Sequence, residues 1–253
     1  MKQIPNLFTL LNLVFGCFAI ILILQTGETL VTQNEGTWVA QLPEKIWWGS
    51  ICIGIAAIID FLDGFVAKLF RAESEIGKQL DSLADVVSFG VAPGLILYQL
   101  LRISYISEES GLDTSFWALA PAFLFPCAGA YRLARFNIDN TQRYGFRGVP
   151  IPAAGLVVAS LPLILLYNYF DLVTVLLNKW LLYAIIVLLS FLMISNLSLM
   201  ALKSKDFSVR NNLPKIILIL SAVVAAIFLQ WLAVPVIFIL YIILSLAFKN
   251  KIA

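Results

Sequence analysis

Eight long apolar segments make up most of this chain, and each is close to the length needed to cross a lipid bilayer. A transmembrane helix needs about 20 predominantly apolar residues, and a backbone in lipid satisfies its hydrogen bonds only as a helix or a closed barrel. The chain is 61% hydrophobic and 13% charged, whereas a soluble domain contains about 25% charged residues. We therefore predict an all-α polytopic membrane protein, a helical bundle of about eight transmembrane helices. They lie near 6–25, 46–70, 80–102, 115–136, 150–169, 180–201, 213–229 and 231–248.

Three of these segments need a closer description. The last two are short and are separated only around Gln230–Pro235, so they form either a tight hairpin or one broken helix. Eight is the expected number of spans, and six is the lower limit. The first apolar run is longer than that of a typical signal peptide, and no small-residue cleavage site follows it. We interpret it as the first membrane helix.

The positions of Lys and Arg predict the orientation, because cytoplasmic loops carry an excess of positive charge. With the N-terminus in the cytoplasm, all of the 17 Lys and Arg residues fall on the inner side except Lys45, Arg102 and Lys179. We therefore expect a multi-pass protein of the inner (cytoplasmic) membrane, surrounded by the lipid bilayer, with residues 60–85 on the cytoplasmic side. The net charge of +2 gives no reason to expect a nucleic-acid partner.

The chain contains no histidine, which excludes His as a general base, metal ligand or pH switch. Its three cysteines, Cys17, Cys52 and Cys127, are far apart in apolar runs and match no zinc-binding spacing. We predict that they are small buried hydrophobic residues, as free cysteines usually are.

Four carboxylates lie in or beside apolar sequence between residues 60 and 85. Asp60 and Asp63 are three residues apart, and Asp81 and Asp85 are four apart, so each pair shares one helix face. An ionisable residue in a membrane helix costs roughly 2.5–3.5 kcal/mol, so four require compensation. Two such pairs that face each other across a helical hairpin would form a set of oxygen ligands suited to Mg²⁺ or Mn²⁺. An intramembrane ion or proton relay is one alternative, and a set of carboxylates neutralised by Lys68 and Arg71 is another.

Small and basic residues accompany the carboxylates. Gly64 is four residues after Asp60, and Gly77 is four before Asp81. Glycine in a helix costs roughly 1 kcal/mol relative to Ala but lets a ligand approach the backbone. Ala67 continues the small face, and Lys68 lies next to it. Carboxylates, small residues and cations on adjoining surface are typical of a pyrophosphate site.

The same residues resemble the signature of the CDP-alcohol phosphotransferase family, D-x2-D-G-x2-A-R-x8-G-x3-D-x3-D. The chain departs from it once, with Lys68 at the position where the family has Arg. The residues that match the signature in spacing are Asp60, Asp63, Gly64, Ala67, Gly77, Asp81 and Asp85.

The resemblance implies roles for these residues. Asp60, Asp63 and Asp81 would bind two divalent metals, with Asp85 completing the second site and acting as general base. Gly64, Ala67, Lys68 and Gly77 would contact the CDP-linked donor. Because lysine is a point charge, it cannot form the bidentate contact with phosphate that arginine forms.

Polar residues near the N-terminus extend the resemblance. Asn6, Thr9 and Asn12 lie three residues apart on one helix face. Asn6 after Pro5 could be an N-cap, and the others ordinary interhelical hydrogen-bonding groups. The pattern P-N-x2-T-x2-N also resembles the start of the phosphatidylserine synthase branch of the family, which implies that Asn6 and Thr9 line the CDP-diacylglycerol site.

Three arginines are candidates for binding an anion. Arg132 and Arg135 are three residues apart in RLARFN, and Arg147 follows in GFRGVPIPAAG. They could be anchors that extend to lipid headgroups, or guanidinium groups that recognise a carboxylate. Both segments resemble the same branch, which implies that the acceptor is L-serine.

The expected activity is therefore transfer of the phosphatidyl group from CDP-diacylglycerol to L-serine, by two-metal catalysis with a carboxylate base. We expect a catalytic membrane domain over residues 1–205, a C-terminal transmembrane hairpin over 206–253 and, from the resemblance, a homodimer. The alternatives are another transferase of the family, such as a phosphatidylglycerophosphate synthase, and a cation or proton transporter.

Overall fold

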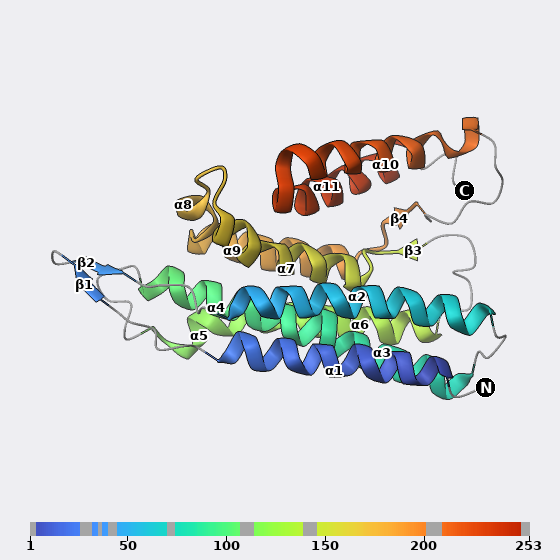
Figure 1. Cartoon of the computed structure of the whole chain (residues 1–253), viewed down its shortest axis with the longest axis horizontal. Coiled ribbons are helices and arrows are strands. Elements are labelled where there is room, and N and C mark those ends of the chain that lie inside the picture. Colours follow the sequence, from blue (N-terminus) through green and yellow to red (C-terminus); the bar gives the residue numbers. More distant parts are fainter. Residues whose placement is uncertain are drawn as a thin grey trace.

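A computed structural model describes residues 4–25, 32–34, 37–39, 45–69, 74–106, 114–138, 146–200 and 209–248. Helices account for almost all of the described backbone (Figure 1). The longer ones are α1 (Ile4–Leu24), α2 (Ile46–Leu69), α3 (Glu75–Asp85), α4 (Ala92–Ile106), α6 (Leu124–Ile138), α7 (Ile151–Tyr167), α9 (Lys179–Ile194), α10 (Val209–Leu229) and α11 (Ala233–Ala247).

Shorter elements join or extend these helices. The π-helix η1 (Val86–Val91) connects α3 to α4 without a break, and α5 (Phe116–Leu119) runs through η3 (Ala120–Phe123) into α6. Helix α8 (Val173–Leu176) precedes α9, and η4 (Gln230–Leu232) lies between α10 and α11. Two antiparallel ribbons pair β1 (Thr32–Asn34) with β2 (Thr37–Val39), and β3 (Phe146–Arg147) with β4 (Ser198–Leu199).

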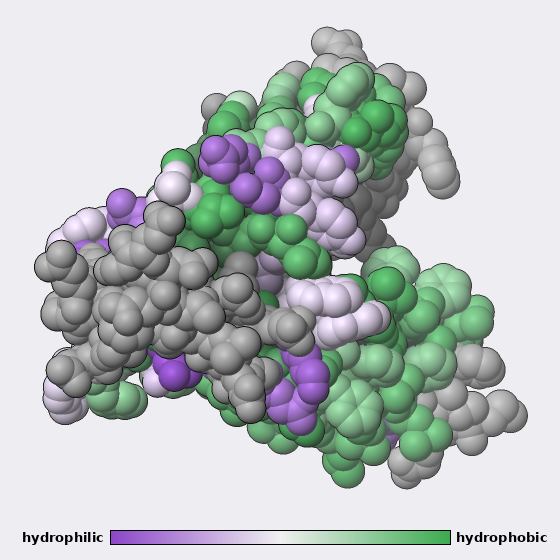
Figure 2. Space-filling view, turned by 60° about the vertical axis from the view of Figure 1, so that its left-hand side comes forward, coloured by the Kyte–Doolittle hydropathy of each residue, from purple (hydrophilic) through white to green (hydrophobic). Residues whose placement is uncertain are grey.

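The predicted membrane fold is confirmed, and every predicted segment contains a helix. Among the described residues, four stretches are long and apolar enough to span a bilayer, namely Pro5–Leu24, Ile46–Val66, Glu75–Ile106 and Pro214–Ala247. The helices α7 and α9 are apolar but shorter. Large apolar side chains are exposed on the outer faces, among them Phe61, Ile227 and Phe228, and hydrophobic surface covers much of the view in Figure 2. This surface suits contact with lipid tails.

The stretch Pro214–Ala247 is a hairpin and not one broken helix. At Gln230 the backbone adopts a left-handed conformation (φ 50°), and α11 then returns along α10 (Figure 1). The segment predicted to reach residue 201 ends at Ile194, where Ser195 is extended and its hydroxyl donates to the Leu192 carbonyl.

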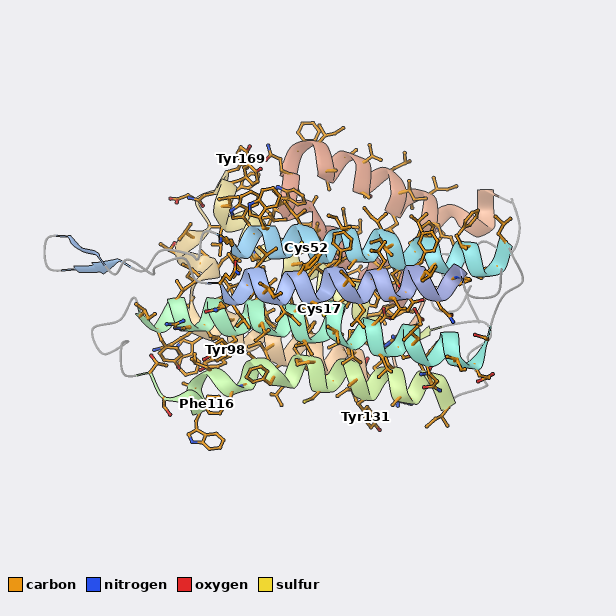
Figure 3. The ribbon with its side chains drawn as sticks, turned by 60° about the horizontal axis from the view of Figure 1, so that its bottom comes forward. Cys17, Cys52, Tyr98, Phe116, Tyr131 and Tyr169 are labelled. Atoms are coloured by element: carbon orange, nitrogen blue, oxygen red, sulfur yellow. The ribbon has the colours of Figure 1, made fainter. Side chains whose placement is uncertain are left out.

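The cysteine prediction is wrong for two of the three residues. Cys17 on α1 and Cys127 on α6 are exposed, whereas Cys52 on α2 is half-buried, and all three are free thiols. Cys17 and Cys52 are labelled in Figure 3. The apolar sequence around these cysteines did not predict burial, because an apolar run in a membrane protein contributes as much to the lipid-facing surface as to the core.

Small residues allow the helices of the core to pack closely, as is usual where helices associate in lipid. A side chain at Gly16 of α1 would collide with Ser88 of η1, and one at Gly155 of α7 would collide with the backbone of Phe89. The Ser88 hydroxyl donates to the Asn12 carbonyl at 3.1 Å. These contacts fix α1 and α7 against the continuous helix α3–η1–α4.

At the end of the bundle that holds β3 and β4, the backbone at Gly148 packs closely against the backbone of residues 192–197. Gly148 follows β3 with φ +75°, and a side chain there would collide with the carbonyl groups of Met193 and Ser195. The Gly148 N–H donates to the Leu197 carbonyl at 2.9 Å. Only glycine combines this backbone conformation with so close an approach.

Candidate functional site

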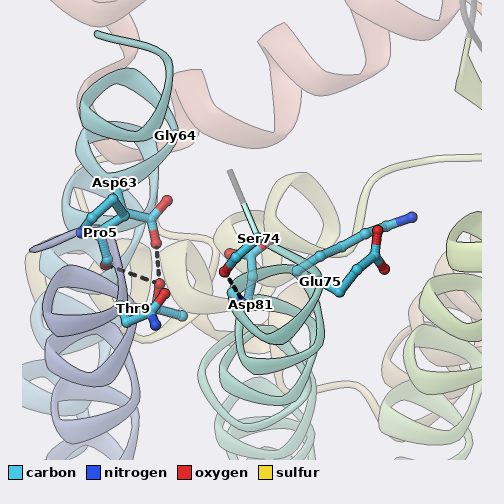
Figure 4. Close-up of a pocket in the computed structure, with 10 residues that line it drawn as sticks. Pro5, Thr9, Asp63, Gly64, Ser74, Glu75 and Asp81 are labelled. Atoms are coloured by element: carbon cyan, nitrogen blue, oxygen red, sulfur yellow. Dashed lines mark hydrogen bonds between the residues drawn. The ribbon is translucent and has the colours of Figure 1, made fainter. Parts of the chain in front are cut away.

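A cavity of about 570 Å³ opens where the N-terminal end of α1 meets the C-terminal end of α2 and the start of α3 (Figure 4). Polar and small residues from the three helices surround it. They are Pro5, Asn6, Thr9, Asp63, Gly64, Ser74, Glu75, Gly77, Lys78 and Asp81.

Local sequence explains why helix α3 begins at this cavity. Ser74 has an extended backbone, and its hydroxyl accepts a hydrogen bond from the Gly77 N–H at 3.0 Å, which is the geometry of an N-cap. Helix α3 therefore begins at Glu75, before the start of the predicted segment 80–102. The N-cap role considered for Asn6 is wrong, because α1 begins at Ile4 and Asn6 lies inside its first turn and lines the cavity.

Three of the predicted carboxylates converge at this cavity. Asp60 and Asp63 of α2 and Asp81 of α3 each offer an oxygen, and these oxygens lie within 4.8 Å of one another. Two like charges 4 Å apart repel by about 4 kcal/mol at an effective dielectric constant of 20. Because all three donors are hard carboxylate oxygens, the group fits a divalent cation such as Mg²⁺.

One of these carboxylates is oriented by α1. Asp63 is 8% exposed, and its Oδ2 accepts a hydrogen bond from Thr9 Oγ1 at 2.8 Å (Figure 4). A carboxylate oxygen has lone pairs for more than one partner, so this bond leaves Asp63 able to bind a cation. Thr9 therefore fixes the rotamer of a candidate metal ligand.

Asp85 lies one turn deeper, at the point where α3 becomes the π-helix η1. It is 7% exposed and interacts electrostatically with the other three carboxylates and with Arg132. Within the described part of the chain its Oδ1 has no hydrogen-bond partner. Buried polar atoms are nearly always paired, so this oxygen is available to a bound group. Wider π-helical turns occur frequently at functional sites.

The three candidate arginines differ in their surroundings. Arg132 on α6 is 8% exposed and is near Asp85, and its Nε has no hydrogen-bond partner among the described residues. Arg135 donates to the Ile194 carbonyl at 3.4 Å and to Asn196 Oδ1, so it ties α6 to the end of α9. The side chain of Arg147 lies outside the described residues.

Of the remaining predicted donor-site residues, Gly64 and Gly77 line the cavity. A Cβ at Gly77 would lie 3.0 Å from both Asn6 Oδ1 and Ser74 Oγ, whereas one at Gly64 would meet nothing within 4 Å. Lys68 is exposed on the last turn of α2 and does not line the cavity. The side chain of Ala67 is outside the described part of the chain.

Lys78 lines the cavity, although its sequence position indicated only an inner-side charge. Its ammonium group donates to the Asn137 carbonyl at 3.3 Å, and the Asn137 amide donates to Ser82 Oγ at 2.8 Å. These bonds join the start of α3 to the end of α6. The signal that could have identified Lys78 is its place directly after Gly77, at the first turn of the helix that carries Asp81 and Asp85.

Comparisons with known proteins agree with this geometry. The family model of the CDP-alcohol phosphatidyltransferases matches residues 2–192. The chain is 42% identical over 142 residues to a CDP-diacylglycerol–serine O-phosphatidyltransferase of Helicobacter pylori (strain ATCC 700392 / 26695), which covers 55% of each chain. Over 108 residues it is 44% identical to the enzyme of that name from Methanocaldococcus jannaschii, which covers 43% of this chain and 47% of the relative.

A third relative is matched over more of its length. The CDP-diacylglycerol–serine O-phosphatidyltransferase of Bacillus subtilis (strain 168) is 30% identical over 161 residues, which cover 64% of this chain and 76% of the relative. The chain thus spans about half the length of the first two relatives and about three quarters of the third.

Proposed function

Because the chain belongs to the CDP-alcohol phosphatidyltransferase family, we propose that it transfers the phosphatidyl group of CDP-diacylglycerol to the hydroxyl of L-serine, giving phosphatidylserine and CMP. The observation that carries this proposal is the group of Asp60, Asp63 and Asp81 oxygens within 4.8 Å of one another beside the cavity. The names of the relatives support serine as the acceptor.

The carboxylates would hold the metal. Asp60, Asp63 and Asp81, joined by Asp85, would bind two divalent ions, Mg²⁺ or Mn²⁺. When bound, such ions neutralise a pyrophosphate and stabilise charge on the attacking and leaving oxygens. Thr9 keeps Asp63 in place for this role through its 2.8 Å hydrogen bond.

Asp85 would act as the general base. It would accept the proton of the serine hydroxyl while the hydroxyl oxygen bonds to the phosphorus that carries diacylglycerol, and the bond from that phosphorus to the CMP oxygen breaks. The free Oδ1 of Asp85 supports this role, and no histidine competes for it. A general base must come within about 2.6–3.2 Å of the proton-bearing atom, or reach it through one water.

The cavity would hold the donor, and an arginine the acceptor. Asn6, Thr9, Gly64 and Gly77 line the space that CDP would enter, and Ala67 and Lys68, on the last turn of α2, would also contact the donor. Among the arginines, the buried and partly unpaired Arg132 is best suited to the serine carboxylate.

Arg147 remains a second candidate for the serine carboxylate. The contacts of Arg135 with Ile194 and Asn196 favour a structural role for that residue.

The membrane arrangement that we propose follows the charge distribution. The N-terminus and the site would face the cytoplasm, where a nucleotide-activated substrate is made, and the protein would reside in the inner membrane as a homodimer. This orientation places most Lys and Arg residues on the inner side.

A CMP-release assay tests the proposed function. Purified protein in detergent is given CDP-diacylglycerol and Mn²⁺ or Mg²⁺, with L-serine, glycerol 3-phosphate or inositol as acceptor. We expect CMP release with serine and its loss on addition of EDTA, with recovery when excess metal is restored. Release with glycerol 3-phosphate or inositol instead of serine would keep the reaction class and reject the acceptor. Metal-dependent cation transport without CMP release would reject both.

A further inference from the structure

Charge is unevenly distributed around the cavity between α1, α2 and α3 (Figure 4). Among the described residues that line it, Asp63, Glu75 and Asp81 are acidic and Lys78 is the only basic one. Lys68, the cation that the family signature places on α2, is exposed and is not part of this lining. An anionic group that enters the described part of the cavity would therefore meet the positive charge of Lys78.

A ring of hydrogen bonds holds Lys78 at the cavity. Its ammonium group donates to the Asn137 carbonyl at 3.3 Å, and the Asn137 amide donates to Ser82 Oγ at 2.8 Å. The Ser82 hydroxyl donates to the Lys78 carbonyl at 3.2 Å, which closes the ring. Because Asn137 lies in the last turn of α6, these bonds fix the first turns of α3 to the end of α6.

The bond to Asn137 leaves the charge of Lys78 available to a ligand. The carbonyl oxygen is neutral, and an ammonium group has three N–H donors, of which this bond uses one. The side chain is also exposed, so its other donors can reach a bound group. Lys78 and Asp81 are three residues apart and both line the cavity, so the cation and a candidate metal ligand share one helix face.

The arrangement of charges selects the class of anion. The cavity of about 570 Å³ lies in the usual range for small-molecule sites, roughly 300–1,000 Å³. Its carboxylate group suits a divalent cation, and its lysine is a second positive charge on the same helix face. A ligand that meets both needs several anionic oxygens on adjacent centres, as a pyrophosphate has, and lysine is a common phosphate-binding residue.

We propose that Lys78 is a binding residue for the pyrophosphate of the CDP-linked donor. The first turn of α3 would thus supply a cation at the cavity, in addition to the lysine that the signature places on α2. This inference rests on the proposed function for the identity of the donor, but it does not depend on the acceptor. The phosphate of a bilayer lipid headgroup offers similar chemistry from another source, and the experiment separates the two.

Binding of CDP, the water-soluble part of the donor, tests the contact. The full-length protein is studied in detergent with Mg²⁺ and without added lipid, and the midpoint of the CDP titration is read from Tm. Lys45→Gln is the matched control, because Lys45 is exposed, bonds Gln25 and lies at the other end of α2. Cytidine is the matched ligand without phosphate.

We expect Lys78→Gln to weaken CDP binding by about three- to tenfold, between the effect of an exposed ion pair and that of a charged hydrogen bond. Lys78→Arg keeps the positive charge and should retain CDP affinity within about twofold, and Lys45→Gln should bind CDP as the wild type does. All variants should bind cytidine equally. The CDP affinity of Lys78→Gln should also change less than that of the wild type between about 0.05 and 0.5 M NaCl, because salt screens an exposed charge contact.

The outcomes separate this inference from its alternatives. Unchanged CDP affinity in Lys78→Gln, the result expected of a lipid-headgroup anchor, would overturn the proposal. An equal loss in Lys45→Gln, or an equal loss of cytidine binding in Lys78→Gln, would overturn it as well. CDP binding that depends on Lys78, in a protein that releases no CMP with serine, would refute the proposed function and support this inference.

Discussion

The hydrogen bond between Thr9 and Asp63 gives the sharpest test of the carboxylate group. Thr9 is 4% exposed, and its hydroxyl donates to the Asp63 carboxylate at 2.8 Å. Thr9→Val removes this bond and keeps the shape of the side chain. A hydrogen bond to a charged group contributes about 1.5–3 kcal/mol, and each 1.4 kcal/mol corresponds to about a tenfold change in binding. We therefore expect Mn²⁺ affinity to fall by about 10- to 100-fold, the range typical for partners that orient a metal ligand.

The assay is the Tm of the purified protein in detergent as a function of Mn²⁺ concentration. A ligand that binds only the folded state raises Tm by mass action, so weaker binding moves the whole titration to higher concentration. Thr9→Ser is the matched control, because it keeps the hydroxyl and should keep the wild-type midpoint. If Thr9→Val has the wild-type midpoint, or if Thr9→Ser shifts as far as Thr9→Val, then Thr9 does not orient a metal ligand.

Three further predictions follow from the site. Asp85→Asn should retain Mn²⁺ binding by Asp60, Asp63 and Asp81 in the Tm assay and lose about 10²–10⁴-fold in kcat; normal turnover would remove Asp85 as the base. Gly77→Ala should raise the KM for CDP-diacylglycerol, because the added Cβ would lie 3.0 Å from Asn6 Oδ1 and Ser74 Oγ at the cavity. Gly54→Ala is the control and should behave as the wild type, because its Cβ would meet nothing within 4 Å. Similar kinetics in both variants would show that the donor does not need the space that Gly77 leaves open. Arg135→Ala should destabilise the protein by about 0.5–1.5 kcal/mol because it removes the exposed hydrogen bonds that tie α6 to the end of α9, and an unchanged Tm would contradict the structural role.

The membrane fold could be predicted from sequence because each helix is specified locally. Hydropathy alone located the helices, and the three- and four-residue spacings put Asp60 with Asp63 and Asp81 with Asp85 on common faces. The convergence of the two pairs needed more information, since it depends on how α2 and α3 cross and rotate. The family signature supplied that information, because it relates residues on two helices.

The side chains that pack between distant helices could not be assigned in this way. Arg132 and Arg135 have the same charge and lie in the same turn of sequence, yet one is near Asp85 and the other binds the end of α9. The difference arises from the rotation of α6 about its axis, which is set by packing against α9 and η1.

The π-helical turn η1 has a consequence for the tolerance of this chain to changes in length. One residue in an α-helix corresponds to a rotation of about 100°, and the wider turn between Asp85 and Ala92 absorbs the phase difference between the carboxylate-bearing face of α3 and the packed face of α4. Removing one residue from 86–91 would leave a continuous helix that is apolar enough for the membrane but out of phase across the turn. The carboxylate-bearing face of α3 could then no longer point to the cavity while the packed face of α4 points into the bundle. Natural variation in length should therefore be confined to the loops.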